Sequence, residues 1–410
     1  MPGAGVQPLI IYRIKSTFPS PQAHTVQVMH TVHALARAGA EVWFYAAEFT
    51  APTAREVLDY YGLTEHPNLT LRQPPQWTKR SRRWKGKLIP PWEWWRFGRL
   101  ARRRPVFYLR NGQDTYEYTQ HVAAMRQKWN ARVVMEMHRV RTMELEEYSR
   151  PDTPPHLLSE LNDRLRWQAS QEVAALRAAD GVTAICATLA EAVRESCPGL
   201  GEIGVVHSAA NVAETPDTPL SHRKGIVYAG QLYGWKGVFT LVDAMAQVPG
   251  ETLTMVGGKD EADIVAVRER ARQLGIEDRI RLVGYVAHHE VAKYLAHARC
   301  AVIPLGTDII ARRFTSPMKA FEYMASGTPI VAADLPTVRE ILRHEESALL
   351  APPEDAAALA QQIKRMMSDD ALAERLRQQA RQDLGQYTWD QRAKRILSFI
   401  ETIPAPRDRA

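Results

Sequence analysis

The sequence predicts an α/β protein with two doubly wound domains, each a parallel sheet covered by helices. Short apolar runs alternate with amphipathic helical stretches, and the alternation restarts after a polar, proline-bearing stretch at residues 211–224. The length of 410 residues is sufficient for two or three domains. We expect one domain at residues 1–210, a second at 211–385, and a closing helix at 386–410.

The first elements of the chain form a strand–helix–strand unit. Residues 9–12 (LIIY) are typical of a buried strand, residues 25–38 carry apolar side chains at helical spacing, and residues 41–46 are the next strand. Gly39 stands where a glycine commonly ends a helix. Two strands joined through a helix are parallel, so this unit begins a parallel sheet.

The same alternation extends to the end of the first domain. The predicted strands are residues 106–109, 132–137, 181–185 and 203–206, and the predicted helices are residues 116–129 and 157–179. Residues 188–191 (TLAE) have the form of a capping box, which predicts a further helix there.

The second domain repeats this organisation. Its predicted strands are residues 225–229, 253–256, 281–283, 301–304 and 329–332, with helices between them and helices from residue 353 to the end. Sheets of this kind bind ligands at the carboxyl ends of their strands, and the cleft between two such domains is the natural site.

The composition of the chain excludes several classes of protein. A hydrophobic fraction of 45% excludes a disordered chain, and a net charge of +7 is compatible with an anionic partner. Cys186, Cys197 and Cys300 are too few for a disulfide framework and fit a reducing compartment. The N-terminus has no pattern of a secretory signal, and no apolar run is long enough to span a bilayer. We therefore expect a cytoplasmic protein.

Two glycine-bearing loops follow strands of the second domain. Residues 230–237 (GQLYGWKG) lead from a strand into a helix, where backbone amides and Lys236 can approach a phosphate. Gly257 and Gly258 end the next strand and permit close approach of a ligand. Ordinary turns are the alternative for both loops.

A third segment, residues 316–329 (SPMKAFEYMASGTP), is predicted to be a helix. Ser316 has the character of an N-cap, Pro317 fits the first helical position, and Gly327 ends the helix. Lys319 and Glu322 share one face, so the helix can offer amides and a cation to a diphosphate and a carboxylate to ribose hydroxyls. A surface Lys–Glu pair is the alternative.

In this order, the segments resemble the retaining nucleotide-sugar glycosyltransferases of the GT-B fold, the family-four group. The resemblance covers most of residues 225–400. It is carried by Lys236-Gly237 and by residues 256–258 (VGG), 283–286 (VGYV), 316–329 and 334–341. Residues 387–389 (YTW) are similar to the start of the family's final helix, and residues 179–185 and 206–211 are similar to segments before its second domain.

The resemblance implies a fold and a donor site. The fold would be two Rossmann-like domains facing across a cleft, with the C-terminal helix returning to the first domain. Lys236 and Lys319 would hold the donor diphosphate, Glu322 the ribose, and the loop after residue 284 the base. The predicted donor-binding residues are Gly230, Gln231, Lys236, Gly237, Gly257, Gly258, Tyr285, Val286, Ser316, Pro317, Met318, Lys319 and Glu322.

The sequence departs from the family pattern at three places. Phe314 stands where a glutamate is usual, and Gln231 stands where a basic residue often follows the first glycine. Residues 19–24 (PSPQAH) replace the glycine loop of the first domain, with Ala23 where a glycine is expected.

The acceptor is expected to meet the first domain. His138 ends a predicted strand and resembles a histidine of the family, so it is predicted to be catalytic with Lys236 and Lys319. A structural strand-end histidine is the alternative. Ala23, His24 and Arg110 are the other predicted acceptor-side residues.

No cofactor is expected, because the nucleotide-sugar is a substrate. The sequence has no Asp-x-Asp motif, so no metal is expected and the charge of the leaving group would be met by the lysines and helix dipoles. The resemblance implies that the anomeric configuration is retained and that the departing phosphate takes the proton of the acceptor.

A basic, tryptophan-rich segment at residues 79–104 carries eleven Lys and Arg and one acid, so its charge of +10 exceeds that of the whole chain. Cations beside tryptophans suit an anionic membrane surface, a solvated basic face, or nucleic acid. The residues predicted to meet a membrane are Arg80, Arg82, Arg83, Trp84, Lys85, Trp92, Trp94 and Trp95.

These observations predict a glycosyltransferase that moves a sugar from a nucleotide-sugar to a glycan, lipid-linked or small-molecule acceptor, in the cytoplasm or peripherally at the cytoplasmic membrane face. Two other functions stay open at this point: a nucleotide-sugar epimerase of the same fold, and a basic nucleic-acid-binding protein.

Overall fold

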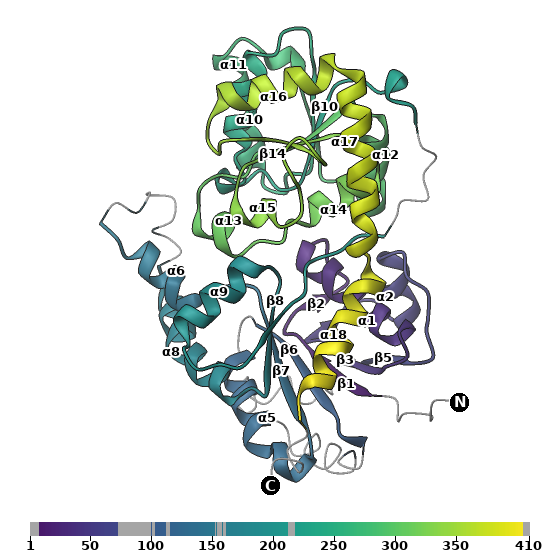
Figure 1. Cartoon of the computed structure of the whole chain (residues 1–410), viewed down its shortest axis with the longest axis vertical. Coiled ribbons are helices and arrows are strands. Elements are labelled where there is room, and N and C mark those ends of the chain that lie inside the picture. Colours follow the sequence, from purple (N-terminus) through teal and green to yellow (C-terminus); the bar gives the residue numbers. More distant parts are fainter. Residues whose placement is uncertain are drawn as a thin grey trace. The chain divides into compact units, whose positions relative to one another are not determined.

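The computed structural model describes residues 8–72, 103–111, 115–151, 161–211 and 218–404, and the single residues 100, 153 and 158. The chain divides into two compact units (Figure 1). Unit 1 comprises Met1–His207 and Trp389–Ala410, and unit 2 comprises Ser208–Thr388. Each unit is a doubly wound α/β domain, which confirms the predicted fold class.

The sheet of unit 1 has seven strands, paired in parallel in the order β5-β3-β1-β6-β7-β8-β9. These strands are β1 (Leu9–Arg13), β3 (Glu41–Tyr45), β5 (Leu69–Arg72), β6 (Val106–Arg110), β7 (Arg132–Met137), β8 (Gly181–Ala184) and β9 (Ile203–Val205). The short strands β2 (Thr17–Phe18) and β4 (Glu48–Phe49) pair separately. The helices are α1 (Ala23–Arg37), α2 (Ala54–Tyr60), α5 (Thr115–Trp129), α6 (Arg141–Tyr148), α8 (Asp163–Ala178), α9 (Ala187–Ser196) and α18 (Trp389–Thr402).

The sheet of unit 2 has six parallel strands in the order β12-β11-β10-β13-β14-β15. These strands are β10 (Ile226–Ala229), β11 (Leu253–Val256), β12 (Ile280–Gly284), β13 (Cys300–Ile303), β14 (Ile330–Ala333) and β15 (Leu349–Ala351). The α-helices are α10 (Val238–Ala246), α11 (Glu261–Gln273), α12 (His288–His297), α13 (Ile309–Arg313), α14 (Met318–Ala325), α15 (Pro336–Arg339), α16 (Ala356–Ser368) and α17 (Asp370–Asp383). Short 3₁₀ turns are η3 (Leu220–His222), η4 (Gly234–Lys236), η5 (Glu277–Arg279) and η6 (Leu384–Gln386).

The strand order places a switch point in each sheet. In unit 1 the chain leaves β1 toward β3 and β5, then returns to β6 on the other side of β1. In unit 2 the chain leaves β10 toward β11 and β12, then returns to β13. The loops that follow β1 and β6, or β10 and β13, run apart at the carboxyl edge of the sheet, and ligands bind in the crevice between such loops.

Both faces of these sheets are buried, which explains why the strands are continuous apolar runs. In β10, Ile226 and Tyr228 pack into one core with helices α10 and α16. The alternate residues Val227 and Ala229 pack into a second core with helix α14. The two-residue period of a strand therefore supplies apolar side chains to both layers of helices.

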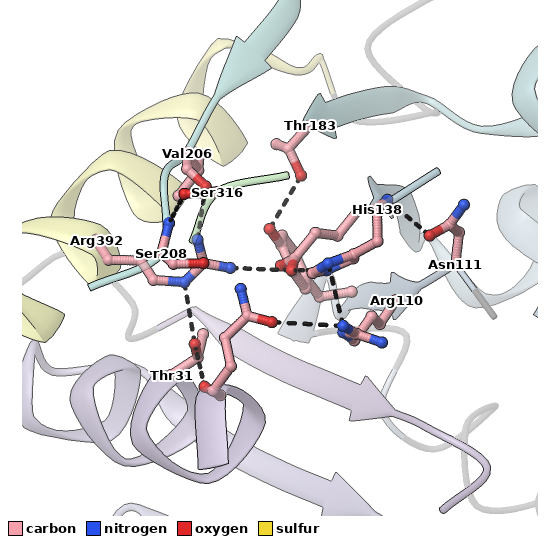
Figure 2. A network of polar contacts seen from close by, with 12 residues as sticks. Thr31, Arg110, Asn111, His138, Thr183, Val206, Ser208, Ser316 and Arg392 are labelled. Carbon is pink, nitrogen blue, oxygen red and sulfur yellow. Dashed lines mark hydrogen bonds and ion pairs between the residues drawn. The ribbon is translucent and has the colours of Figure 1, made fainter. Parts of the chain in front are cut away.

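The last helix, α18, belongs to unit 1 and packs along α1 (Figure 1). Its Arg392 side chain is 1% exposed and forms an ion pair of 2.9 Å with Glu136 of β7, which is equally buried. The Arg392 Nε atom donates to Thr31 Oγ1 (3.0 Å), and Nη1 donates to the carbonyl oxygens of Val206 and His207 (both 2.6 Å), as Figure 2 shows in part. A single guanidinium thus joins four segments of unit 1.

Several predicted elements differ from the structure. Helix α8 begins at Asp163 rather than near residue 157, because the Asn162 side chain accepts from the backbone N–H of Leu165 and caps the helix there. The predicted capping box at Thr188 is wrong: Cys186 is the N-cap, and the Thr188 hydroxyl donates to its Sγ atom (3.3 Å). The sequence analysis also missed the strands β2, β4, β5 and β15.

None of the helices in the described part of the chain is both long enough and apolar enough to cross a membrane.

We predict that Arg392→Leu will destabilise the protein by about 3–5 kcal/mol at pH 7, because it leaves the buried Glu136 carboxylate without its ion-pair partner. Burial alone would raise the pKa of Glu136, but Arg392, His138 and Arg110 together hold it well below 4.5. The ion pair therefore stabilises the fold fully at a pH above 4.5, the pKa of Glu136 in the unfolded chain. This stabilisation is lost as the pH falls through the lower pKa of Glu136 in the folded protein.

In the Arg392→Leu variant Glu136 keeps its hydrogen bond from His138 but loses the ion pair, so its pKa should be higher than in wild type, and the stability difference from wild type should shrink as the pH falls toward 4. Urea unfolding followed by circular dichroism measures both effects. The exposed Lys394 of the same helix provides the control, since Lys394→Leu should change stability by less than about 0.5 kcal/mol. Equal behaviour of the two variants would contradict the prediction.

Candidate functional site

The carboxyl edge of the unit 2 sheet is built from turns that contact each other through their backbones. The amide of Gly230 donates to Val256 O, and the amide of Gly257 donates to Gly284 O (both 2.8 Å). A Cβ atom on Gly257 would lie 2.2 Å from Gly230 O, and a Cβ atom on Gly237 would lie 1.6 Å from Pro304 O. Glycine is therefore required for the loops after β10, β11 and β13 to meet at this edge.

Lys319 brings a charged group to the same edge. It is the second residue of α14, and its side chain reaches the Gly230 turn, where a Cβ atom would be 3.1 Å from the Nζ atom. The residue is only 9% exposed, and Nζ has no hydrogen-bond partner among the described residues. Nζ lies 3.9 Å from the centre of the Tyr228 ring, a cation–π contact. Burial, followed by repulsion from Lys236, lowers the pKa of Lys319 well below its ordinary value.

Lys236 lies near Lys319 and ends the η4 turn just before Gly237. Its Nζ atom lies 5.3 and 5.5 Å from the ring centres of Trp235 and Tyr233. Burial lowers the pKa of Lys236 to about 8, against an opposing effect of Glu322. Two ammonium groups thus lie close together at one switch point, Lys319 buried and Lys236 partly exposed.

Glu322 lies one turn along α14 from Lys319. Its carboxylate is 3.8 Å from His288 Nε2 and accepts no hydrogen bond from any described residue. Glu322 opposes the lowering of the pKa of both lysines, so its charge is close to theirs. The site therefore offers two cations and one carboxylate, the groups that a diphosphate and vicinal hydroxyls would use.

Other predicted donor residues border this arrangement. Gly258 would place a Cβ atom 2.8 Å from Leu232, and Gln231 Oε1 accepts from the Lys259 amide (3.0 Å), so both hold the loops together. Tyr285 is 49% exposed after the end of β12, and Val286 packs partly against the core.

The start of α14 differs from the prediction by one residue. Pro317 is the N-cap and Met318 the first helical residue, so Ser316 is not the N-cap. The Ser316 hydroxyl accepts from the Ser208 amide (2.9 Å) and holds the chain at the start of unit 2 (Figure 2). Proline at this N-cap supplies no side-chain acceptor, so the amides of the first turn of α14 lack a side-chain cap.

In unit 1 the predicted acceptor-side residues gather at the switch point of its sheet. Ala23 begins α1, and His24 follows it with Nε2 at 3.1 Å from Ser16 Oγ. Arg110 ends β6, and its Nη2 atom donates to His138 Nδ1 (3.0 Å) and to Gln27 Oε1 (3.4 Å) (Figure 2). Burial, followed by the charge of Arg110, lowers the pKa of His24 to about 4.

Both ring nitrogens of His138 are engaged. Because Nδ1 accepts from Arg110, Nε2 carries the proton and donates to Glu136 Oε1 (2.6 Å). Burial, then Arg110, lowers the pKa of His138 to about 3, so the ring is neutral at pH 7. A catalytic role for His138 stays a prediction, and it would require one of these two hydrogen bonds to be exchanged.

A cavity of about 740 Å³ opens at this switch point, and His24, Arg110 and His138 line it. The sequence analysis missed other charged residues of its wall, which are Lys15, Arg139, Arg141, Glu144 and Arg164. Lys15 and Arg139 each lie two residues after the end of a strand. Because ligands bind at the carboxyl ends of parallel strands, both residues could have been predicted from the sequence. Arg164 comes from the first turn of α8, and no local signal marks it.

The predictions of a membrane-binding segment and of a reaction without a metal remain. The residues predicted to meet a membrane, from Arg80 to Trp95, lie outside the described residues. Among the described residues, His, Cys, Asp and Glu side chains form no group of three that could hold a metal ion. That the reaction needs no metal stays a prediction.

Comparisons with known proteins find similarity over part of the chain in sequence and over nearly all of it in structure. Residues 223–369 match the family model described as glycosyl transferases group 1. Glycogen synthase of Mycobacterium tuberculosis is 28% identical over 217 residues, which are 51% of this chain and 50% of that protein. The chain thus spans about half the length of the curated relatives it matches.

Solved structures are similar over nearly the whole chain. Sucrose-phosphate synthase from Thermosynechococcus elongatus has a TM-score of 0.70 at 22% identity, over 97% of this chain and 98% of that one. The Anabaena protein HepE, solved in complex with UDP, has a TM-score of 0.69 at 15% identity, over 97% and 100% of the two chains. At these identities the likeness shows the fold, which is the GT-B fold.

We predict that Gly237→Ala will destabilise unit 2 by at least about 2 kcal/mol, since Gly237 has a φ of 70° and its Cβ atom would overlap Pro304 O. Gly234, three residues earlier, has open space at its Cβ position, so Gly234→Ala should be nearly neutral. Urea unfolding of both purified variants tests this pair. A Gly237→Ala protein as stable as Gly234→Ala would show that the loops do not meet as described.

Proposed function

Since residues 223–369 are a domain of the glycosyl transferases group 1 family and the whole chain has the GT-B fold, we propose that the protein is a glycosyltransferase using a nucleotide-sugar donor. The acceptor is a glycan, a lipid-linked molecule or a small molecule. Nothing in the comparisons supports an epimerase or a nucleic-acid-binding protein, the two functions left open by the sequence.

The unpartnered ammonium of Lys319 carries this proposal. Burying a charge without a partner is costly, and a protein retains such a group where a ligand supplies the opposite charge. The Lys319 and Lys236 ammonium groups lie close together at the carboxyl edge, and the first turn of α14, which carries Lys319, has no side-chain cap. A diphosphate places two adjacent anionic groups at such a point, and charge-assisted hydrogen bonds replace the repulsion between the lysines.

The rest of the donor follows from this placement. Glu322, one turn from Lys319, accepts hydrogen bonds from the two ribose hydroxyls. The base lies by the loop after β12, where exposed Tyr285 offers a ring face. The Anabaena protein HepE has been solved with UDP and with UDP-glucose, which supports a uridine nucleotide as the first donor to test.

The chemistry breaks the bond between the anomeric carbon and the diphosphate oxygen and forms a bond from that carbon to an acceptor hydroxyl oxygen. The departing phosphate takes the hydroxyl proton, and the anomeric configuration is retained. Lys319 and Lys236 stabilise the charge that develops on the leaving group, the largest task in such a transfer. The residues around His138 orient the acceptor from unit 1.

We place the reaction in the cytoplasm, since the three cysteines are free and buried. A peripheral position on the membrane, through the basic segment at residues 79–104, is part of this proposal and is tested by sedimentation with anionic vesicles.

Replacing Lys319 should have different effects on the stability of the ligand-free protein and on its affinity for UDP. Lys319→Met removes a buried unpaired charge, so the ligand-free protein should be equally or more stable. The same change should weaken UDP binding by at least about thirtyfold, corresponding to the loss of about 2 kcal/mol or more from a buried charge pair. Thermal unfolding and calorimetric titration with UDP measure the two effects.

Lys364→Met, on the exposed face of α16, is the matched control and should change neither quantity. Incubation with UDP-glucose and a panel of acceptors then tests transfer, and the proton spectrum of the product tests retention. A Lys319→Met protein that binds UDP as wild type does would remove the basis of the proposal.

Affinity for UDP should depend on pH through the lysines. Binding of the diphosphate should raise the pKa of Lys236 from about 8, so the complex takes up protons near pH 8 and affinity falls as the pH rises above that value. Calorimetry in buffers of different ionisation enthalpy measures this uptake. The Lys236→Arg variant, whose guanidinium stays charged, should bind UDP with less uptake and a flatter pH profile; proton release on binding would contradict the assignment.

A further inference from the structure

His288 is the first residue of α12 and follows the turn after β12, at the carboxyl edge of the unit 2 sheet. In that turn Gly284 has a φ of 78°, and its carbonyl oxygen accepts from the Gly257 amide (2.8 Å). This hydrogen bond ties the end of β12 to the glycine turn after β11. Helix α12 therefore begins at the same edge of the sheet as α14, the helix that carries Lys319.

Helices α12 and α14 are held together by a shared core. Val291 and Tyr294 of α12 pack against the core cluster that contains Phe321 of α14. Beyond the end of α14, the Thr328 hydroxyl donates to the carbonyl oxygen of Leu295 in α12 (2.8 Å). These contacts on two sides determine which side chains of the two helices meet at the carboxyl edge.

The side chains that meet there are His288 and Glu322, with 3.8 Å between His288 Nε2 and Glu322 Oε1. This separation is longer than a hydrogen bond. Neither side chain forms a hydrogen bond with any residue in the described part of the chain. The His288 side chain is 49% exposed and that of Glu322 is 21% exposed, so a ligand at this edge can reach both.

A hydroxyl group matches this pair because it can donate one hydrogen bond while it accepts another. It would donate to the Glu322 carboxylate and accept from the N–H group at His288 Nε2. An oxygen about 2.8 Å from each of these atoms is compatible with their separation of 3.8 Å. A phosphate oxygen is a poor match, since it would face the negative charge of Glu322.

We propose that His288 is a further donor-binding residue, which binds one ribose hydroxyl together with Glu322 and makes the site selective for ribonucleotides over deoxyribonucleotides. This inference rests on the proposed function, in which Lys319 contacts the diphosphate and Glu322 accepts from the ribose. It adds a residue that the sequence analysis did not select. A site built to bind a hydroxyl discriminates strongly against a ligand that lacks it, because its polar groups are then left without their partner.

The test compares UDP with 2′-deoxy-UDP and 3′-deoxy-UDP in calorimetric titrations of the full chain. We expect wild type to bind at least one deoxy analogue about tenfold or more weakly than UDP. His288→Ala should weaken binding of UDP by about fivefold or more, and binding of that analogue by less than about twofold. The variant thus loses most of the discrimination, whereas a change in folding alone would weaken the binding of all three nucleotides alike.

His289→Ala is the matched control, because it removes the neighbouring exposed histidine of the same helix. It should bind all three nucleotides as wild type does. His288→Gln keeps an N–H donor on a side chain of similar length, so it should retain more of the preference for UDP than His288→Ala. Thermal unfolding of the ligand-free proteins should give the same Tm for wild type and both alanine variants, since both histidines are exposed.

A double-mutant cycle tests whether His288 and Glu322 share one hydroxyl. Residues that bind the same group have coupled effects, so His288→Ala should weaken UDP binding much less in a Glu322→Ala background than in wild type. Additive effects of the two substitutions on the affinity for UDP would contradict a shared hydroxyl.

Failure of this inference is distinct from failure of the proposed function. If UDP binds through Lys319 but His288→Ala leaves its preference over both deoxy analogues unchanged, the function stands and the role of His288 is wrong. Equal affinities of wild type for UDP and both analogues, or equal effects of His288→Ala and His289→Ala, overturn the role of His288 in the same way. If wild type binds none of UDP, ADP and GDP, the proposed function and this inference are both overturned.

Discussion

The proposed donor site depends on the desolvation of one ammonium group, that of Lys319. A lysine on a surface helix would be hydrated and would bind a diphosphate weakly. Here the Gly230 turn and the Tyr228 ring enclose the Nζ atom, and no described residue offers it a hydrogen bond. The fold thus keeps a buried ammonium group at a switch point, and in the proposed function a bound anion would offset the cost of burying it.

Glycine at two positions makes this enclosure possible. Gly237 and Gly257 let the loops after β10, β11 and β13 approach each other backbone to backbone, and any side chain would hold them apart. The loops then bring Lys236 and Lys319 together although they are far apart in the sequence. Unit 1 also has a switch point, beside β1 and β6, where a cavity is lined by Arg110 and His138 among others. Each unit therefore presents positive charge at the carboxyl edge of its sheet.

The network around Arg392 has a different role. It leaves His138 neutral and oriented, because Glu136 accepts from the histidine and from the arginine at once. Four segments of unit 1 meet at this guanidinium, including the last helix of the chain and the residues that lead into unit 2. The orientation of His138 thus depends on a residue more than two hundred positions later in the sequence.

Local patterns determined much of this fold. Apolar runs such as residues 9–12 and 226–229 could only be buried strands, and the glycine turns with Lys236 and the helix with Lys319 and Glu322 could be located from sequence order alone. The spacing of apolar residues did not predict short strands such as β15 or the helix caps at Asn162, Cys186 and Pro317. These features depend on contacts with neighbouring segments. Only the tertiary structure decided that Lys319 is buried and that its Nζ atom has no hydrogen-bond partner among the described residues, because burial arises from segments that are distant along the chain.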